Sequence, residues 1–252
     1  MASDHRVGGS NPSGRANRPR RTAVSAGQDR RDRPYRGGDL FSGLEAAALE
    51  APIREGDWNP KDFQAHLTAW KARQAERFGA IREGRELPPP MDDQEEDAIN
   101  AELRSTRIDW SWSDVADEAD AVTDRLVPEI RQADPDMLRG SERLLSGTLG
   151  NGVLHTLTHL RWLLEAKVPL DRSRVARFES DAQRAVSAAA LPAKLRAVGL
   201  YDLACYHALG GSTQTARTLL RDAFRLDPEL VEFSQTDDEL VSVRGELDAL
   251  AT

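Results

Sequence analysis

Residues 58–70 read Trp58-Asn59-Pro60-Lys61-Asp62-Phe63-Gln64-Ala65-His66-Leu67-Thr68-Ala69-Trp70, which contains both the start and the apolar face of a helix. Asn59 suits the N-cap, Pro60 the first helical position, and Asp62 places a negative charge in the first turn. The residues that then fall largely on one stripe are Phe63, His66, Leu67, Trp70, Phe78 and Ile81. The pattern predicts a long amphipathic helix that ends at Gly84, before a Pro88-Pro89-Pro90 linker.

Other helical signals flank this segment on both sides. A short first helix is expected over residues 40–51, and another follows the acidic residues 92–97. Ser111 and Asp114 can form a capping box that opens a helix with apolar residues every three or four positions, and Pro128 should kink its last turns. Residues 153–166, after Gly147 and Gly150, are apolar on nearly every face and predict a central helix. Residues 40–167 therefore predict an antiparallel four-helix bundle.

The C-terminal part predicts stacked helical hairpins, with helices near residues 172–189, 193–209, 214–226 and 237–250. Residues 200–228 resemble one tetratricopeptide repeat. Its packing positions are matched by Leu203, Ala204, His207, Ala216, Leu220, Ala223 and Pro228. Because one repeat cannot bury its own faces, we expect it to dock on the bundle through the 172–189 helix and to be capped by the 237–250 helix.

Composition favours an all-α chain. Of the 252 residues 39% are hydrophobic and 30% charged, aromatic residues are few, and runs of β-branched residues are absent. No stretch approaches the ~18 consecutive apolar residues of a membrane-spanning helix. The single cysteine, Cys205, excludes an internal disulfide and a cysteine-rich zinc module. We expect Cys205 and His207 to be packing residues rather than a nucleophile and a ligand.

Charge is distributed unevenly along the chain. Residues 1–40 hold nine arginines and four aspartates, a balance of +5, so the remaining residues carry −13 within the net charge of −8. An acidic body repels phosphate backbones, which argues against nucleic acid as a partner. Residues 1–37 contain almost no apolar side chains and predict a disordered, solvated tail without a signal peptide. A start codon placed too early would give the same composition, and the alternative is a functional basic arm that touches nucleic acid or an acidic partner.

The histidines suggest a metal site. His155 and His159 are four residues apart and share one helix face, while His66 lies on the core-facing stripe of another helix. A buried imidazole without a partner costs about 1–3 kcal/mol, and a divalent cation could satisfy all three rings at once. Three neutral histidine ligands leave a position open for water or a thiol. The alternative is that each histidine merely hydrogen-bonds a carbonyl or a neighbouring side chain.

Three motifs resemble those of the DinB-like four-helix-bundle superfamily, most closely its ClbS/DfsB branch. Residues 58–70 match W-x-x-K-D-x-x-x-H-L-x-x-W, residues 97–102 match D-x-x-N-A-E, and residues 155–160 match H-x-x-x-H-L. The resemblance covers residues 40–167 and keeps the family's order. It implies a site for zinc, nickel or iron, with His66, His155 and His159 as ligands. It also implies chemistry related to thiol-dependent S-transferases and isomerases that use mycothiol, bacillithiol or glutathione, and to resistance against a genotoxin.

Two hypotheses follow. In the first, a cytoplasmic bacterial protein uses a divalent metal to activate a thiol or water against a small electrophile, and Trp70 and Trp162 shape the pocket. No general base is evident on the ligand helices, so no catalytic residue is assigned. In the second, a non-catalytic helical scaffold sequesters a toxic small molecule or binds a peptide through its repeat. The expected parts are a tail at 1–37, a bundle at 38–167 and a hairpin region at 168–252, with no membrane contact.

Overall fold

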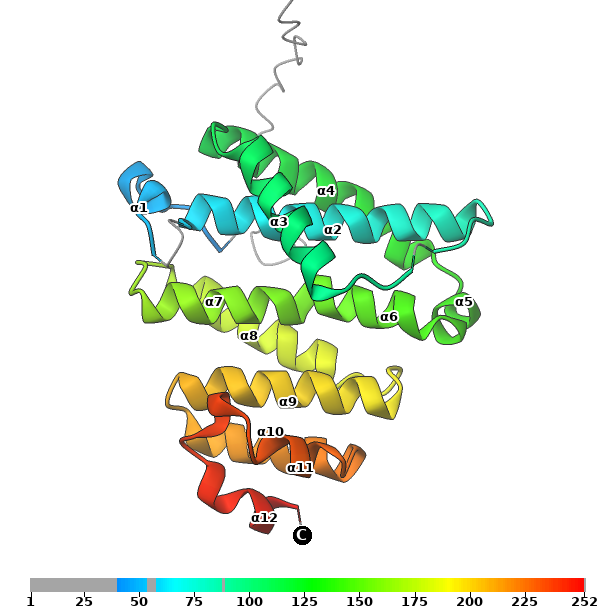
Figure 1. Cartoon of the computed structure of the whole chain (residues 1–252), viewed down its shortest axis with the longest axis vertical. Coiled ribbons are helices and arrows are strands. Elements are labelled where there is room, and N and C mark those ends of the chain that lie inside the picture. Colours follow the sequence, from blue (N-terminus) through cyan, green and yellow to red (C-terminus); the bar gives the residue numbers. More distant parts are fainter. Residues whose placement is uncertain (1–39, 54–57, 88, 252) are drawn as a thin grey trace, which may run out of the picture. The chain divides into compact units, whose positions relative to one another are not determined.

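The computed structural model describes residues 40–53, 58–87 and 89–251, and in these ranges the chain is all-α with no strand. Figure 1 shows that successive long helices pack against one another in antiparallel directions. The predicted tail at residues 1–37 lies outside the described ranges. None of the described helices combines the length and the apolar character that crossing a bilayer requires.

The predicted N-terminal cap of the long helix is confirmed. Helix α2 spans Pro60–Arg82, and the Asn59 side chain accepts the backbone N–H of Asp62 at 2.8 Å. The Asp62 carboxylate in turn accepts the backbone N–H of Asn59 at 3.2 Å, which completes a capping box. The expectation of a single apolar stripe was too narrow, because every residue from 60 to 70 is buried. This half of α2 is enclosed by other elements on all sides.

Three of the helices that contact α2 are α1 (Ala46–Glu50), α3 (Asp93–Arg107) and α4 (Trp112–Gln132). The first helix is shorter than expected because residues 40–43 form a turn, whose Leu40 and Phe41 side chains are buried. Helix α4 opens with the predicted capping box and packs along α2, whereas α3 crosses α2 obliquely (Figure 1). Buried positions on α4 are those of the predicted spacing: Val115, Ala119, Val122 and Leu126.

The predicted helix at 153–166 is the last part of a longer, continuous helical segment. After α5 (Pro135–Gly140), the chain is helical through α6 (Glu142–Leu149), a π-helical turn at Gly150–Leu154 and α7 (His155–Glu165). Gly147 and Gly150, which precede the predicted helix in the sequence, lie within this continuous helical segment. Gly147 serves close packing, since a Cβ atom there would lie 2.8 Å from Oε1 of Gln74 in α2.

Three of the four predicted C-terminal helices are present: α8 (Arg172–Val186), α9 (Ala193–Leu209) and α10 (Thr213–Leu226). Helices α9 and α10 form a hairpin whose turn uses Gly211 at φ +77°, a conformation that glycine adopts at little cost. The hairpin packs on α8, as expected, and α9 also contacts α7 and the π-helical turn directly.

The fourth expected helix, at 237–250, was wrong. The chain forms α11 (Leu230–Ser234), two short 3-10 turns and α12 (Leu247–Leu250). Asp237 accounts for the break, because its carboxylate accepts the N–H of Glu239 while Arg244 donates to its carbonyl oxygen. The buried side chains nevertheless recur at helical spacing, which explains the misleading pattern: Leu240, Val243, Leu247 and Leu250.

A single hydrophobic cluster includes residues from both sides of position 167. Phe63 and Leu160 belong to it, and so do Leu203, Leu220 and Leu247. The domain boundary expected at residue 167 stays a prediction.

The contact between α8 and α9 leads to a stability prediction. A Cβ atom at Gly199 would lie 2.8 Å from Cγ1 of Val186, a fully buried β-branched side chain that cannot easily rotate. Although alanine usually stabilises a helix relative to glycine, we expect Gly199→Ala to destabilise the protein by about 1–3 kcal/mol. Urea unfolding measures this. The Gly199→Ala, Val186→Ala double variant should lose less stability than the two single variants together, and simple additivity would contradict the proposed clash.

Candidate metal centre

Three imidazole rings meet between α2 and α7. His66 projects from α2, and His155 and His159 project from the first turns of α7. The Nε2 atom of His155 lies 2.8 Å from Nε2 of His66 and 2.9 Å from Nε2 of His159. The ligand atoms of the three rings all lie within 4.8 Å of one another. The structure therefore brings together the three residues that the sequence suggested as ligands.

The π-helical turn at Gly150–Leu154 ends directly before His155. A π-helical turn holds one more residue than an α-helical turn, so it rotates the side chains that follow relative to those that precede. His155 and His159 thus point from α7 at an angle that a continuous α-helix from α6 would not give them. Such turns are frequent at functional sites. This turn was not predicted, and Gly150 and Gly152 were the only sign of it in the sequence.

The spacing of the three nitrogens fits a metal ion. Imidazole nitrogens bound to one zinc ion at ~2.0–2.1 Å in a tetrahedral arrangement lie roughly 3.3 Å apart. The two closest separations are 2.8 and 2.9 Å, so the rings need to move apart only slightly to accept an ion. An all-imidazole donor set suits zinc, nickel, iron or copper better than calcium or magnesium.

The protonation of the rings also fits ligation. Burial, and then the neighbouring His155, lower the pKa of His66 to about 3. Burial, and then the positive charge of Lys71, lower the pKa of His155 to about 4. Both imidazoles are therefore neutral near pH 7, which is the form that binds metals. A cation would accept a lone pair from every Nε2 atom, whereas hydrogen bonds between the rings require some of these atoms to carry a proton.

Aromatic rings surround the triad. Trp58 stands edge-on to His66 with 5.4 Å between ring centroids, and Phe63 and Trp162 lie 4.8 and 4.6 Å from the ring of His159. Trp70 lies 6.4 Å from the ring of His66. Both tryptophans proposed from the sequence, Trp70 and Trp162, contact the triad. The contacts of Trp58 and Phe63 with the histidines were not predicted.

A pocket of about 330 Å³ opens onto the triad. Trp162 lines it, but Trp70 does not, since Trp70 only contacts the imidazoles from the side. Helix α3 supplies Glu96 and Asn100 to the wall, and Trp70 donates its indole N–H to Oδ1 of Asn100 at 3.0 Å. The carboxylate of Glu96 therefore borders the pocket from α3, a helix that carries none of the three histidines. A search for a base on the ligand helices alone could not find it.

Lys71 is a charged residue near the triad that was not predicted from the sequence. It follows Trp70 in α2 and is close enough to His155 to depress the pKa of that ring. Burial lowers the pKa of Lys71 itself to about 8. Within the part of the chain that the structure describes, no carboxylate pairs with it. A lysine with this pKa can exchange a proton near neutral pH.

A second group of potential ligands is already engaged elsewhere. Cys205, Asp237 and Glu239 gather beside α9, but the hydroxyl of Tyr201 donates to Asp237 at 2.7 Å and Arg161 pairs with Glu239. Burial and these carboxylates raise the pKa of the Cys205 thiol, so it stays protonated. The expectation that Cys205 packs in the core agrees with its 3% exposure.

This acidic group predicts a pH dependence of stability. Burial, and then the charges of Glu239 and Asp237, raise the pKa of Asp202 to about 7. In the unfolded chain an aspartate ionises near pH ~3.9, so between roughly pH 4 and 7 the folded protein holds the extra proton and loses stability as the pH rises. Asp202→Asn should therefore raise the Tm at pH 8 and change it little at pH 4. Thermal melts across this range test it. Asp222→Asn on the surface is the control, and a Tm difference independent of pH would contradict the assignment.

No family model, curated protein or solved structure matches the chain, so no relative assigns a metal or a substrate to this centre.

Proposed function

We propose that this protein is a metalloenzyme in which His66, His155 and His159 hold a divalent ion and a small electrophile reacts with a thiol or water. The observation that carries the proposal is the convergence of three Nε2 atoms beneath an open pocket. Zinc, nickel and iron are the candidate ions. In S-transfer the thiolate would form a carbon–sulfur bond as the bond to a leaving group such as halide breaks, which gives a thioether, the free leaving group and the proton of the thiol. In hydrolysis water would add across the bond that is cleaved.

Three histidine ligands leave a position where a divalent ion lowers the pKa of water to about 7 or holds a thiol as thiolate. The remaining tasks fall to the chain. Trp58, Phe63 and Trp162 exclude water and contact an apolar substrate. Glu96 borders the pocket and can accept the proton of the attacking thiol or water, while Lys71, which is not among the lining residues, adds a positive charge near His155.

The motif order supports placing the chain near the DinB-like bundles, with a tetratricopeptide-like hairpin appended. The matching residues include His66, Asn100 and the His155–His159 pair, and in the structure Asn100 borders the pocket that holds the three histidines. A low-molecular-weight thiol is the co-substrate that this resemblance favours. The biological role would then be detoxification or resistance to a reactive compound.

Sequestration without turnover is the second candidate, and the aromatic lining of the pocket favours it. Rings such as Trp58 and Trp162 can enclose a flat ligand without any chemistry at the triad.

The test uses the full chain loaded in turn with zinc, nickel or ferrous iron. Consumption of a low-molecular-weight thiol is followed in the presence of an activated aryl halide. We expect a metal-dependent rate that chelation abolishes and metal restores, and the His207→Ala variant should keep it because His207 lies on α9 outside the triad. Equal rates with and without metal would contradict the enzyme. Saturable binding of the halide without turnover would support sequestration instead.

A further inference from the structure

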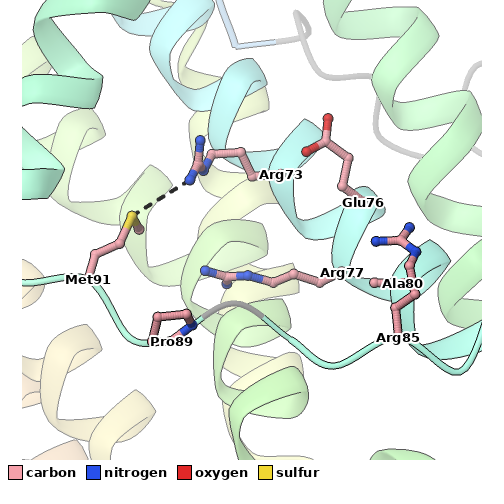
Figure 2. Close-up of a pocket in the computed structure, with 7 residues that line it drawn as sticks. All are labelled: Arg73, Glu76, Arg77, Ala80, Arg85, Pro89 and Met91. Atoms are coloured by element: carbon pink, nitrogen blue, oxygen red, sulfur yellow. Dashed lines mark hydrogen bonds between the residues drawn. The ribbon is translucent and has the colours of Figure 1, made fainter.

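A pocket of about 210 Å³ lies between α2 and the linker that follows it, and arginines dominate its lining (Figure 2). Three arginines and one glutamate are among its lining residues, which are Arg73, Glu76, Arg77, Ala80, Arg85, Pro89 and Met91. It is a different pocket from the one at the histidine triad, with which it shares no lining residue.

Positive charge is concentrated on one side of this pocket. Arg73 and Arg77 are one turn apart on α2, and in Figure 2 both guanidinium groups reach toward the linker, whereas the carboxylate of Glu76 points away from them. Arg143 of α6 adds a third charge, since burial and then the charges of Arg143 and Arg73 lower the pKa of Arg77. Three cations therefore stand together in a chain with a net charge of −8.

Glu76 is the only carboxylate among the residues that line the pocket, and it forms no ion pair with these arginines in the described part of the chain. Within the described ranges, no carboxylate lies within ion-pair distance of Arg73, Arg77 or Arg143. Arg73 donates to Sδ of Met91 at 3.6 Å and stacks over the ring of Trp70 at 5.5 Å. Arg85 differs, because it pairs with Glu83 at 2.8 Å.

Arg77 is held in place by a buried amide. Gln74, which is completely buried, donates its Nε2 to the carbonyl of Leu144 and to the hydroxyl of Thr148. These bonds fix its Oε1, which accepts a hydrogen bond from Arg77 at 3.1 Å. Gly147 makes room for both side chains, since a Cβ atom there would lie 2.9 Å from Nη1 of Arg77. A donor held in this way loses little freedom when it binds a ligand.

We propose that Arg73 and Arg77, which line this pocket, form a binding site for a phosphate-type oxyanion, either free or as the end of a small ester, and that Arg143, which is near Arg77 but not among the lining residues, adds positive charge to it. Guanidinium groups match such anions with paired, charge-assisted hydrogen bonds. A doubly charged tetrahedral anion can meet both lining arginines from different directions, and it would reduce the repulsion among the three. We expect the site to bind its anion without the metal, because the two pockets share no lining residue.

Calorimetric titration of the full chain with inorganic phosphate at constant ionic strength tests this site. We expect saturable binding of one phosphate per chain, and at least about tenfold weaker binding in Arg77→Gln and in Arg143→Gln. The matched control is Arg184→Gln, an exposed arginine paired with Asp181, which should change the affinity less than about twofold. Acetate, with one charge, should bind at least about tenfold more weakly than phosphate.

Several results would overturn the proposal. They are the absence of saturable binding to the unchanged protein, equal affinity in the Arg77→Gln and Arg143→Gln variants, and equal affinity for acetate. Loss of phosphate binding after chelation of metal would place the anion at the histidine triad instead. Circular dichroism melts separate lost binding from unfolding. Replacing Arg77 relieves repulsion but removes the donor to the buried Oε1 of Gln74, so the binding result counts for a variant that is still folded at the temperature of the titration.

Discussion

The His155→Ala variant is expected to bind a divalent ion at least about a hundredfold more weakly than the unchanged protein, because loss of an outer partner alone costs 10–100-fold. His155 is the middle ring of the triad, with its Nε2 within 2.9 Å of Nε2 in His159 and 2.8 Å of Nε2 in His66. Its removal leaves two nitrogens on different helices and an opening that water can enter. Competition with a coloured chelator measures the affinity.

His207→Ala is the control for this variant. His207 lies on α9, where its ring packs against Tyr206 at 5.3 Å, so its loss should leave metal affinity unchanged. Elemental analysis of both variants, purified without a histidine tag, should show metal only in His207→Ala. Equal metal content in the two variants would show that the ion sits elsewhere.

The Phe63→Ala variant is expected to lose about 3–5 kcal/mol of unfolding free energy. Phe63 is only 1% exposed and belongs to the hydrophobic cluster that includes both the N-terminal and the C-terminal helices. Its ring packs 5.3 Å from Trp58 and 5.8 Å from Trp162, so truncation removes contacts on two sides. Urea unfolding, with the slope of the transition checked for two-state behaviour, gives the value.

The matched control is Phe233→Ala. Phe233 is 61% exposed, and its main ring contact is with Tyr201. Beyond the loss of that contact, its truncation should lower the unfolding free energy by no more than about 0.5 kcal/mol. A loss of less than about 1 kcal/mol for Phe63→Ala would contradict the placement of this ring at the centre of the core.

Local signals predicted the helices well where a cap and a buried face occur together. The Asn59–Asp62 and Ser111–Asp114 capping boxes are both present, and α8, α9 and α10 lie near the predicted ranges. The convergence of the histidines was a hypothesis from their spacing, because a pair four residues apart shares one helix face and His66 lies on an apolar stripe, while separate hydrogen bonds for each ring were the alternative.

The features that the sequence did not reveal depend on contacts between helices. Gly147 is needed where α2 approaches α6, and the π-helical turn follows from packing that no local pattern records. Asp237 caps a 3-10 turn at the start of a segment that has helical periodicity. Lys71 and Glu96 gained importance only when α2, α3 and α7 were brought together around one pocket.

X-ray absorption spectroscopy of the full chain after loading with one equivalent of zinc tests the triad most directly. We expect one ion per chain, bound by three imidazole nitrogens at about 2.0–2.1 Å and by one further, exchangeable ligand. A first shell made mainly of carboxylate oxygen or sulfur, or binding far below one ion per chain, would contradict it.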